Sequence, residues 1–177
     1  MSEPGREQPV IYLRAGEMHF SEQPVVVSTV LGSCLSVTMF HRKLAIGAVC
    51  HGFLPQCRSR RACDDGCIEK FKYVDCSIRK MLTLFDGLDV KRRELEVKVF
   101  GGADMFDTAR NGRATFSIGK LNITTAKKII EQEGLSIVSM DVGGTRGRKL
   151  YFHTQTGEVL LKRLQPCVIL ASNGVGK

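Results

Sequence analysis

The sequence predicts an α+β fold: a layered sandwich of mostly antiparallel β-sheet with two main helices packed on it. Many short segments are rich in β-branched residues or alternate apolar with polar residues, whereas only two segments repeat apolar residues at helical spacing. The chain of 177 residues is 43% hydrophobic, which is enough for one compact core. We expect a flexible leader over residues 1–9, a single domain over residues 10–165 and a C-terminal tail over residues 166–177.

Strands are expected to dominate the first part of the chain. β-branched or apolar runs predict them over Val10–Leu13, over Val25–Phe40, which holds two, and over Leu44–Phe53. The two strands of the second run are expected on either side of Gly32-Ser33-Cys34. Residues 56–66 are polar and lack periodicity, which predicts a loop.

Two helices and four more strands are expected in the rest of the chain. Apolar residues recur every three or four positions over Ile68–Phe85, and Gly87 supplies a stop. The second helix is predicted to begin at Thr124 or Thr125, where a hydroxyl can cap it, and to end at Gly134. The remaining strands are predicted over Leu95–Phe100, Ile137–Val142, Lys149–Thr154 and Glu158–Leu164, the last two joined by a turn at Thr156-Gly157.

The charge balance favours an acidic partner. Lys and Arg outnumber Asp and Glu by 26 to 18, a formal net charge of +8. The longest charge-free run, Gln23–His41, is interrupted by Pro, Gly, Ser and Thr, so it does not predict a membrane span. Glu3 and Glu7 stand where a signal peptide would be positively charged. We expect a cytoplasmic protein without membrane insertion.

Three basic clusters could contact such a partner: Arg58–Arg61, Lys91–Arg93 and Arg146–Lys149. Clusters of this kind are most often solvated surface. Their functional interpretation is docking to an acidic protein. Aromatic residues are not interleaved with them, which argues against nucleic-acid binding.

The seven cysteines do not predict a disulfide framework, because the count is odd and the expected compartment is reducing. Cys63 and Cys67 have the spacing of a zinc-binding pair, but Cys57 does not extend the pattern. Inert or redox-sensitive loop thiols are the favoured interpretation, and no metal is expected.

Cys34 is the best candidate for a nucleophile. A cysteine nucleophile needs a base, donors for an oxyanion and access to the substrate. Cys34 follows Gly32 and Ser33, so the backbone can turn sharply beside the thiol. His51 ends the next apolar run, and the two side chains meet if Val25–Leu31 and Leu44–His51 are neighbouring strands. Such a pairing would depress the thiol pKa. The other histidines fit less well: His19, His41 and His153. The alternative is that Cys34 and His51 are ordinary core residues.

A series of motifs supports the first interpretation. In chain order they are Ser28–Cys34, Gly47–Pro55, Tyr73–Asp75, Gly101–Phe106, Ile118-Gly119 with Asn122, Asp141–Arg148 and Thr156-Gly157. In this combination and order, the sequence resembles the CheD family of chemoreceptor glutamine deamidases over nearly the whole chain. Two glycine pairs in these motifs, Gly101-Gly102 and Gly143-Gly144, are expected to shape the groove beside Cys34.

The resemblance implies three catalytic residues. Cys34 and His51 stand 17 residues apart, as the family pattern expects. A hydroxyl residue, Thr in the family, is expected six positions before the cysteine, and this position is Ser28. Thr29 is the alternative, and because successive residues of a strand point to opposite faces, only one of the two can face the site.

The resemblance also implies an activity, protein-glutamine glutaminase, an amide hydrolase that needs no cofactor. Cys34 would attack a glutamine carboxamide and His51 would move the protons. The substrate would be the cytoplasmic helices of a methyl-accepting chemotaxis receptor, and a CheC-type phosphatase is a further candidate partner. The alternative function is a non-catalytic adaptor that binds the receptor or a CheC-type protein.

Overall fold

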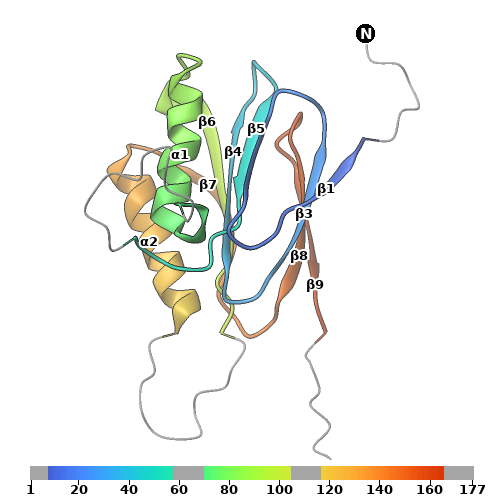
Figure 1. The fold of residues 1–177 in the computed structure, drawn as a ribbon, viewed down its shortest axis with the longest axis vertical. Helices are drawn as coiled ribbons and strands as arrows, with labels where there is room; N and C mark the ends of the chain where they lie inside the picture. The colour runs from blue at the N-terminus through green and yellow to red at the C-terminus, as the bar shows by residue number, and fades with distance from the viewer. Residues whose placement is uncertain (1–7, 58–69, 105–116, 166–177) are drawn as a thin grey trace, which may run out of the picture.

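The structure is a computed structural model that describes residues 8–57, 70–104 and 117–165. Two sheets lie face to face, and both helices cover the outer face of one of them (Figure 1). This arrangement confirms the predicted α+β class. The leader and the tail fall mostly outside the described residues, so the division into leader, domain and tail stays a prediction.

The four-stranded sheet has the order β1-β3-β8-β9. Its strands are β1 (Val10–Tyr12), β3 (Val26–Leu31), β8 (Arg148–His153) and β9 (Val159–Arg163). The β1–β3 pair is parallel, and the β3–β8 and β8–β9 pairs are antiparallel. No helix covers the outer face of this sheet in the part of the chain that the structure describes.

The five-stranded sheet is the central layer and has the order β2-β5-β4-β6-β7. Its strands are β2 (Met18–Ser21), β4 (Leu35–His41), β5 (Ile46–Cys50), β6 (Leu95–Gly101) and β7 (Ile137–Val142). Helices α1 (Val74–Asp86) and α2 (Ile118–Gln132) pack on it. Short 3-10 turns precede α1 and β6 at Lys70–Lys72 and Arg92–Glu94.

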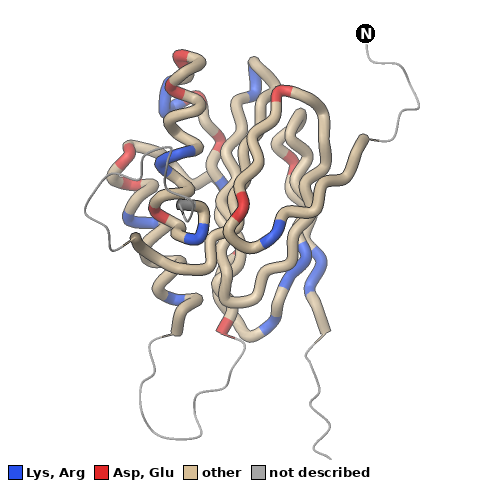
Figure 2. The backbone as a smooth tube through the Cα atoms, viewed as in Figure 1, with Lys and Arg blue, Asp and Glu red and all other residues tan. Residues whose placement is uncertain are grey.

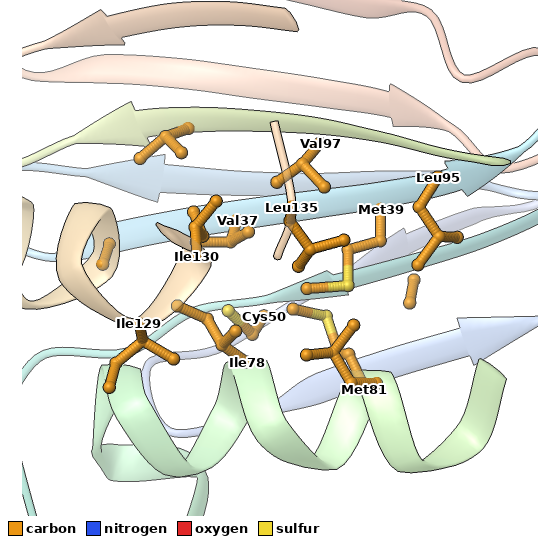
Figure 3. Close-up of a cluster of buried hydrophobic side chains, with 14 of the residues drawn as sticks. Val37, Met39, Cys50, Ile78, Met81, Leu95, Val97, Ile129, Ile130 and Leu135 are labelled. Carbon is orange, nitrogen blue, oxygen red and sulfur yellow. The ribbon is translucent and has the colours of Figure 1, made fainter. Parts of the chain in front are cut away.

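Every residue of β4 is buried, because both faces of the central sheet are covered. On one face, Val37, Met39 and Cys50 pack against the helices (Figure 3). On the other face, Val49 and Phe100 join the core between the two sheets. Burial raises the pKa of the Cys50 thiol to about 12, so this cysteine is an inert core residue.

Two predicted helix starts were wrong, and one strand was missed. Helix α2 begins at Ile118 rather than Thr124, because the Ser117 hydroxyl accepts a hydrogen bond from the Lys120 N–H and caps an earlier start. Helix α1 begins at Val74 rather than Ile68, and Ile68 lies outside the described residues. Strand β2 was not predicted.

Candidate active site

Cys34 and His51 lie on one face of the central sheet, at one end of it. The β4–β5 ladder continues past both strands to a bridge between Leu35 and Gly52, whose backbone N–H···O bonds measure 2.8 and 2.9 Å. In this register Cys34 is opposite Phe53, two residues beyond His51. Residues that are diagonal in this way share a face, with Cα atoms about 7–8 Å apart and Cβ atoms closer. The structure therefore brings the predicted nucleophile and base together.

This face points between the two sheets. Leu35 belongs to the core beneath the helices, so its neighbour Cys34 points the other way, where it packs at the margin of the inter-sheet core. Cys34 is partly exposed, whereas His51 is only 4% exposed. The thiol is thus reachable from solvent while the imidazole is held inside.

Thr29 fixes the orientation and the tautomer of His51. The Thr29 Oγ1 atom lies 2.7 Å from His51 Nδ1 and donates its own hydrogen to the Leu13 carbonyl at 2.8 Å. A hydroxyl has a single hydrogen, so Nδ1 must carry the ring proton and donate it to Oγ1. The neutral ring then has an unprotonated Nε2. This atom is buried and has no hydrogen-bond partner among the described residues, so it is free to accept a proton.

The structure does not place Ser28, the expected third catalytic residue, beside His51. Ser28 is paired in register with Tyr12 and Tyr151, and its side chain points with theirs to the outer face of the four-stranded sheet. Its hydroxyl is buried without a partner among the described residues. Thr29 points to the inter-sheet face instead, so the hydroxyl at the site stands five positions before Cys34, not six.

The free site favours a neutral thiol and a neutral imidazole. Burial raises the pKa of the Cys34 thiol above its ordinary value, although the Cys34 backbone N–H acts in the opposite direction. Burial lowers the pKa of His51, opposed by the Leu13 carbonyl and the Glu17 charge. The expectation of a depressed thiol pKa was therefore wrong for the free protein. The arrangement suits proton transfer during attack on a substrate.

The loop before Cys34 is held by its carbonyl groups. The Gly32 carbonyl accepts from Ala103 N at 2.8 Å, and the Cys34 carbonyl accepts from Gly102 N at 2.7 Å. No atom of the described residues accepts a hydrogen bond from the N–H groups of Gly32 and Ser33. These two donors are therefore candidates for stabilising an oxyanion that forms on attack by Cys34.

Gly101 allows this close approach. It has φ +111°, and a Cβ atom built there would lie 2.3 Å from the Cys34 carbonyl oxygen. A side chain at this position would therefore displace the loop that carries Cys34. The Gly101 part of the Gly101-Gly102 motif thus acts through backbone contact with the Cys34 loop.

Arg148 is a structural residue rather than part of a docking surface. Its side chain is fully buried and donates to the carbonyls of Gly101 and Gly143, each at 2.6 Å. Its Nε lies 3.4 Å from an Asp141 carboxylate oxygen. The surface interpretation is therefore wrong for this member of the basic cluster, because the guanidinium joins the ends of β6 and β7. Figure 2 shows the other basic residues spread over several elements, and Arg58–Arg61 lie outside the described residues.

The other histidines lie away from Cys34. His41 is at the opposite end of β4, and His153 pairs with Val26 at the far end of β3. His19 pairs with Val49 of β5, and Val49 pairs with Thr38 of β4. Thr38 is four residues after Cys34 in the chain. None of the three is placed to act on the thiol.

No group of three or more His, Cys, Asp or Glu side chains within the described ranges could hold a metal ion. Cys63 and Cys67 lie outside those ranges, so the zinc alternative for them stays open. The Cys57 N–H donates to the Asp75 carboxylate at 3.1 Å. None of the described helices is long and apolar enough to cross a membrane.

Comparisons with known proteins show which family this chain is similar to. The profile of the family described as "CheD chemotactic sensory transduction" matches residues 53–163. The "Probable chemoreceptor glutamine deamidase CheD 2" of Geobacter sulfurreducens is 46% identical over 156 residues, which cover 88% of this chain and 91% of that protein. Proteins named "Probable chemoreceptor glutamine deamidase CheD" from Maridesulfovibrio salexigens and Methanococcus maripaludis are 38% and 30% identical, covering 88% and 87% of this chain and 92% and 95% of theirs.

Proposed function

Because the chain belongs to the CheD family, we propose that it is a chemoreceptor glutamine deamidase with Cys34 as nucleophile, His51 as general base and Thr29 as the residue that orients His51. It hydrolyses the side-chain amide of receptor glutamines to glutamate and ammonia, and so acts in chemotaxis adaptation. The observation that carries this proposal is the hydrogen-bond chain from the Leu13 carbonyl through Thr29 to His51 Nδ1, which leaves Nε2 as the proton acceptor.

The first half of the reaction forms a thioester. Cys34 Sγ attacks the carboxamide carbon while its proton moves to His51 Nε2, and the N–H groups of Gly32 and Ser33 stabilise the oxyanion. His51 then gives this proton to the departing nitrogen, and ammonia leaves as the C–N bond breaks. Thr29 holds the imidazolium by accepting from Nδ1–H throughout.

The second half consumes water. His51 Nε2 takes a proton from a water molecule, whose oxygen attacks the thioester carbon. The C–S bond breaks and the sulfur recovers the proton from His51, which restores the free site. The product is the glutamate side chain, and the net reaction is glutamine plus water to glutamate plus ammonia.

The chemoreceptor is the proposed substrate, and the cytoplasmic location follows from that proposal because the receptor helices to be modified lie in the cytoplasm. A CheC-type phosphatase is a proposed further partner, and it is supported by the family resemblance alone. The test is incubation of the protein with a receptor cytoplasmic fragment, followed by peptide mass mapping. We expect specific glutamines to gain the mass difference between OH and NH2. A fragment that is bound but never modified would support the adaptor alternative.

A further inference from the structure

Asn122 joins the two loops that carry the reacting side chains. It lies in α2 and is fully buried. Its Nδ2 group donates to the Ser33 carbonyl at 3.0 Å and to the Phe53 carbonyl at 3.3 Å. An amide nitrogen has two hydrogens, so both bonds can form at once.

The two carbonyls stand at critical points of the site. Ser33 directly precedes Cys34, and Phe53 is two residues after His51. Both lie just beyond the last backbone bridge between these strands, which joins Leu35 and Gly52. The Asn122 amide therefore connects the two loops where that ladder has ended.

The way α2 packs supports a dedicated role for Asn122. A Cβ atom at Gly119 would lie 2.5 Å from the Gly102 carbonyl, so this glycine lets the first turn of α2 approach the end of β6. The approach brings Asn122, one turn later, to the Cys34 loop. Its Oδ1 atom is buried without a partner among the described residues, which is unfavourable. An apolar side chain at this position would avoid that penalty. The two hydrogen bonds that Nδ2 donates therefore explain why an asparagine stands here.

We propose that Asn122 is a positioning residue that sets the separation of Cys34 Sγ and His51 Nε2 by clamping the Ser33 and Phe53 carbonyls. It does not touch the substrate. It acts by keeping the thiol within reach of the imidazole, so that the proton can transfer as the sulfur attacks. Loss of the clamp lets the two loops separate while the sheets stay intact.

The inference rests on the proposed function only where turnover is measured, so the first readout needs no receptor. Iodoacetamide alkylation of Cys34, followed by peptide mapping, reports how readily His51 accepts the thiol proton. At pH 7 we expect Asn122→Ala and the more nearly isosteric Asn122→Asp to lower the Cys34 alkylation rate to that of His51→Ala. Adding His51→Ala to either variant should lower the rate no further, because both changes break one coupled step.

The second readout is turnover of a receptor fragment. Asn122→Ala should lower kcat roughly 10- to 100-fold through misplacement of the reacting groups, with KM unchanged. Thr154→Val is the matched control. Thr154 is equally buried and also bridges backbone groups, accepting from Val25 N and donating to the Gln23 carbonyl, but it does so at the far end of β3. Thr154→Val should lower the urea midpoint and leave both alkylation and kcat unchanged.

Wild-type alkylation in folded Asn122→Ala and Asn122→Asp would overturn the proposal, and so would independent, multiplying effects of Asn122→Ala and His51→Ala. Equal losses in Thr154→Val and Asn122→Ala would also overturn it, because general destabilisation would then explain both. If neither Asn122 variant folds, Asn122→Leu, which keeps the volume without the donors, decides the matter. The two proposals can also fail separately. If Cys34 alkylation changes in the variants as expected but the wild-type protein never deamidates a receptor fragment, the proposed function is refuted and the role of Asn122 stands.

Discussion

Replacing Thr29 by Val should impair catalysis far more than replacing Ser28 by Ala. Valine keeps the shape of threonine but cannot accept the His51 Nδ1–H bond or donate to the Leu13 carbonyl. Both bonds are short, at 2.7 and 2.8 Å, and both lie inside the protein. Without these bonds the imidazole can rotate, and its proton can move from Nδ1 to Nε2. In that tautomer Nε2 cannot accept the thiol proton.

The size of the effect follows from these contacts. Loss of the whole general-base contribution would cost roughly 10²–10⁴-fold in kcat. Because the imidazole remains in Thr29→Val, we expect a smaller loss, of roughly 10- to 100-fold. The variant also leaves two buried polar groups unpaired, which lowers the free energy of unfolding by about 1–3 kcal/mol for each group.

The assay compares kcat on a receptor fragment for Thr29→Val, Thr29→Ser and Ser28→Ala. Thr29→Ser keeps the hydroxyl and should retain most of the activity. Ser28→Ala removes a hydroxyl that has no partner among the described residues, so kcat should stay at the wild-type value. Nitrogen NMR of His51 should show the Nδ1–H tautomer in the wild type and a mixture of tautomers in Thr29→Val.

A larger loss of kcat in Ser28→Ala than in Thr29→Val would refute this reasoning. Such a result would mean that β3 presents its other face to His51 during turnover. An unchanged His51 tautomer in Thr29→Val would also contradict it, because the hydroxyl would then not control the position of the ring proton.

Three further predictions concern the same site. His51→Ala should lower kcat roughly 10²–10⁴-fold, whereas His41→Ala and His153→Ala should cost little; a comparable loss in either control would show that the base is misassigned. The acid limb of the kcat/KM pH profile should be centred below pH 6.5, because burial lowers the pKa of His51 below its ordinary value of 6.5. For the same reason the pKa of His51 is lower in the folded than in the unfolded protein. The contribution of His51 to stability is therefore fully present above pH 6.5 and is lost as the pH falls through the folded pKa. An acid limb centred above pH 6.5 would contradict both statements. Gly101→Ala should lower the thermal midpoint and kcat together, since its Cβ would meet the Cys34 carbonyl oxygen at 2.3 Å; wild-type values for both would show that this contact is easily relieved.

The sequence indicated the Cys34–His51 pair but neither the strands that join it nor its third partner. We expected Val25–Leu31 to lie beside Leu44–His51, whereas the structure pairs β5 with β4 and places β3 in the other sheet. Apolar residues occur at both odd and even positions of the strand from Val26 to Leu31. Alternation therefore could not tell whether Ser28 or Thr29 lies on the face that points to the site. The choice depends on the pairing of β3 with β1 and β8, which is a long-range feature.

The roles of Arg148 and Asn122 were hidden for a similar reason. Arg148 stands in a basic run that has the composition of a surface, and only the fold shows that carbonyls from β6 and the β7–β8 loop surround it. Asn122 precedes the predicted helix start, although the Ser117 hydroxyl was a usable signal for an earlier start. Local patterns predict elements, whereas these contacts join segments far apart in the chain.

Ammonia release from a receptor fragment by Cys34→Ala tests the central claim most directly. The matched control is Cys57→Ser, which changes another partly buried thiol whose backbone N–H, rather than sulfur, contacts Asp75. We predict that Cys34→Ala releases no ammonia although its thermal midpoint is preserved, and that Cys57→Ser releases it at the wild-type rate. Wild-type ammonia release by Cys34→Ala would contradict the account.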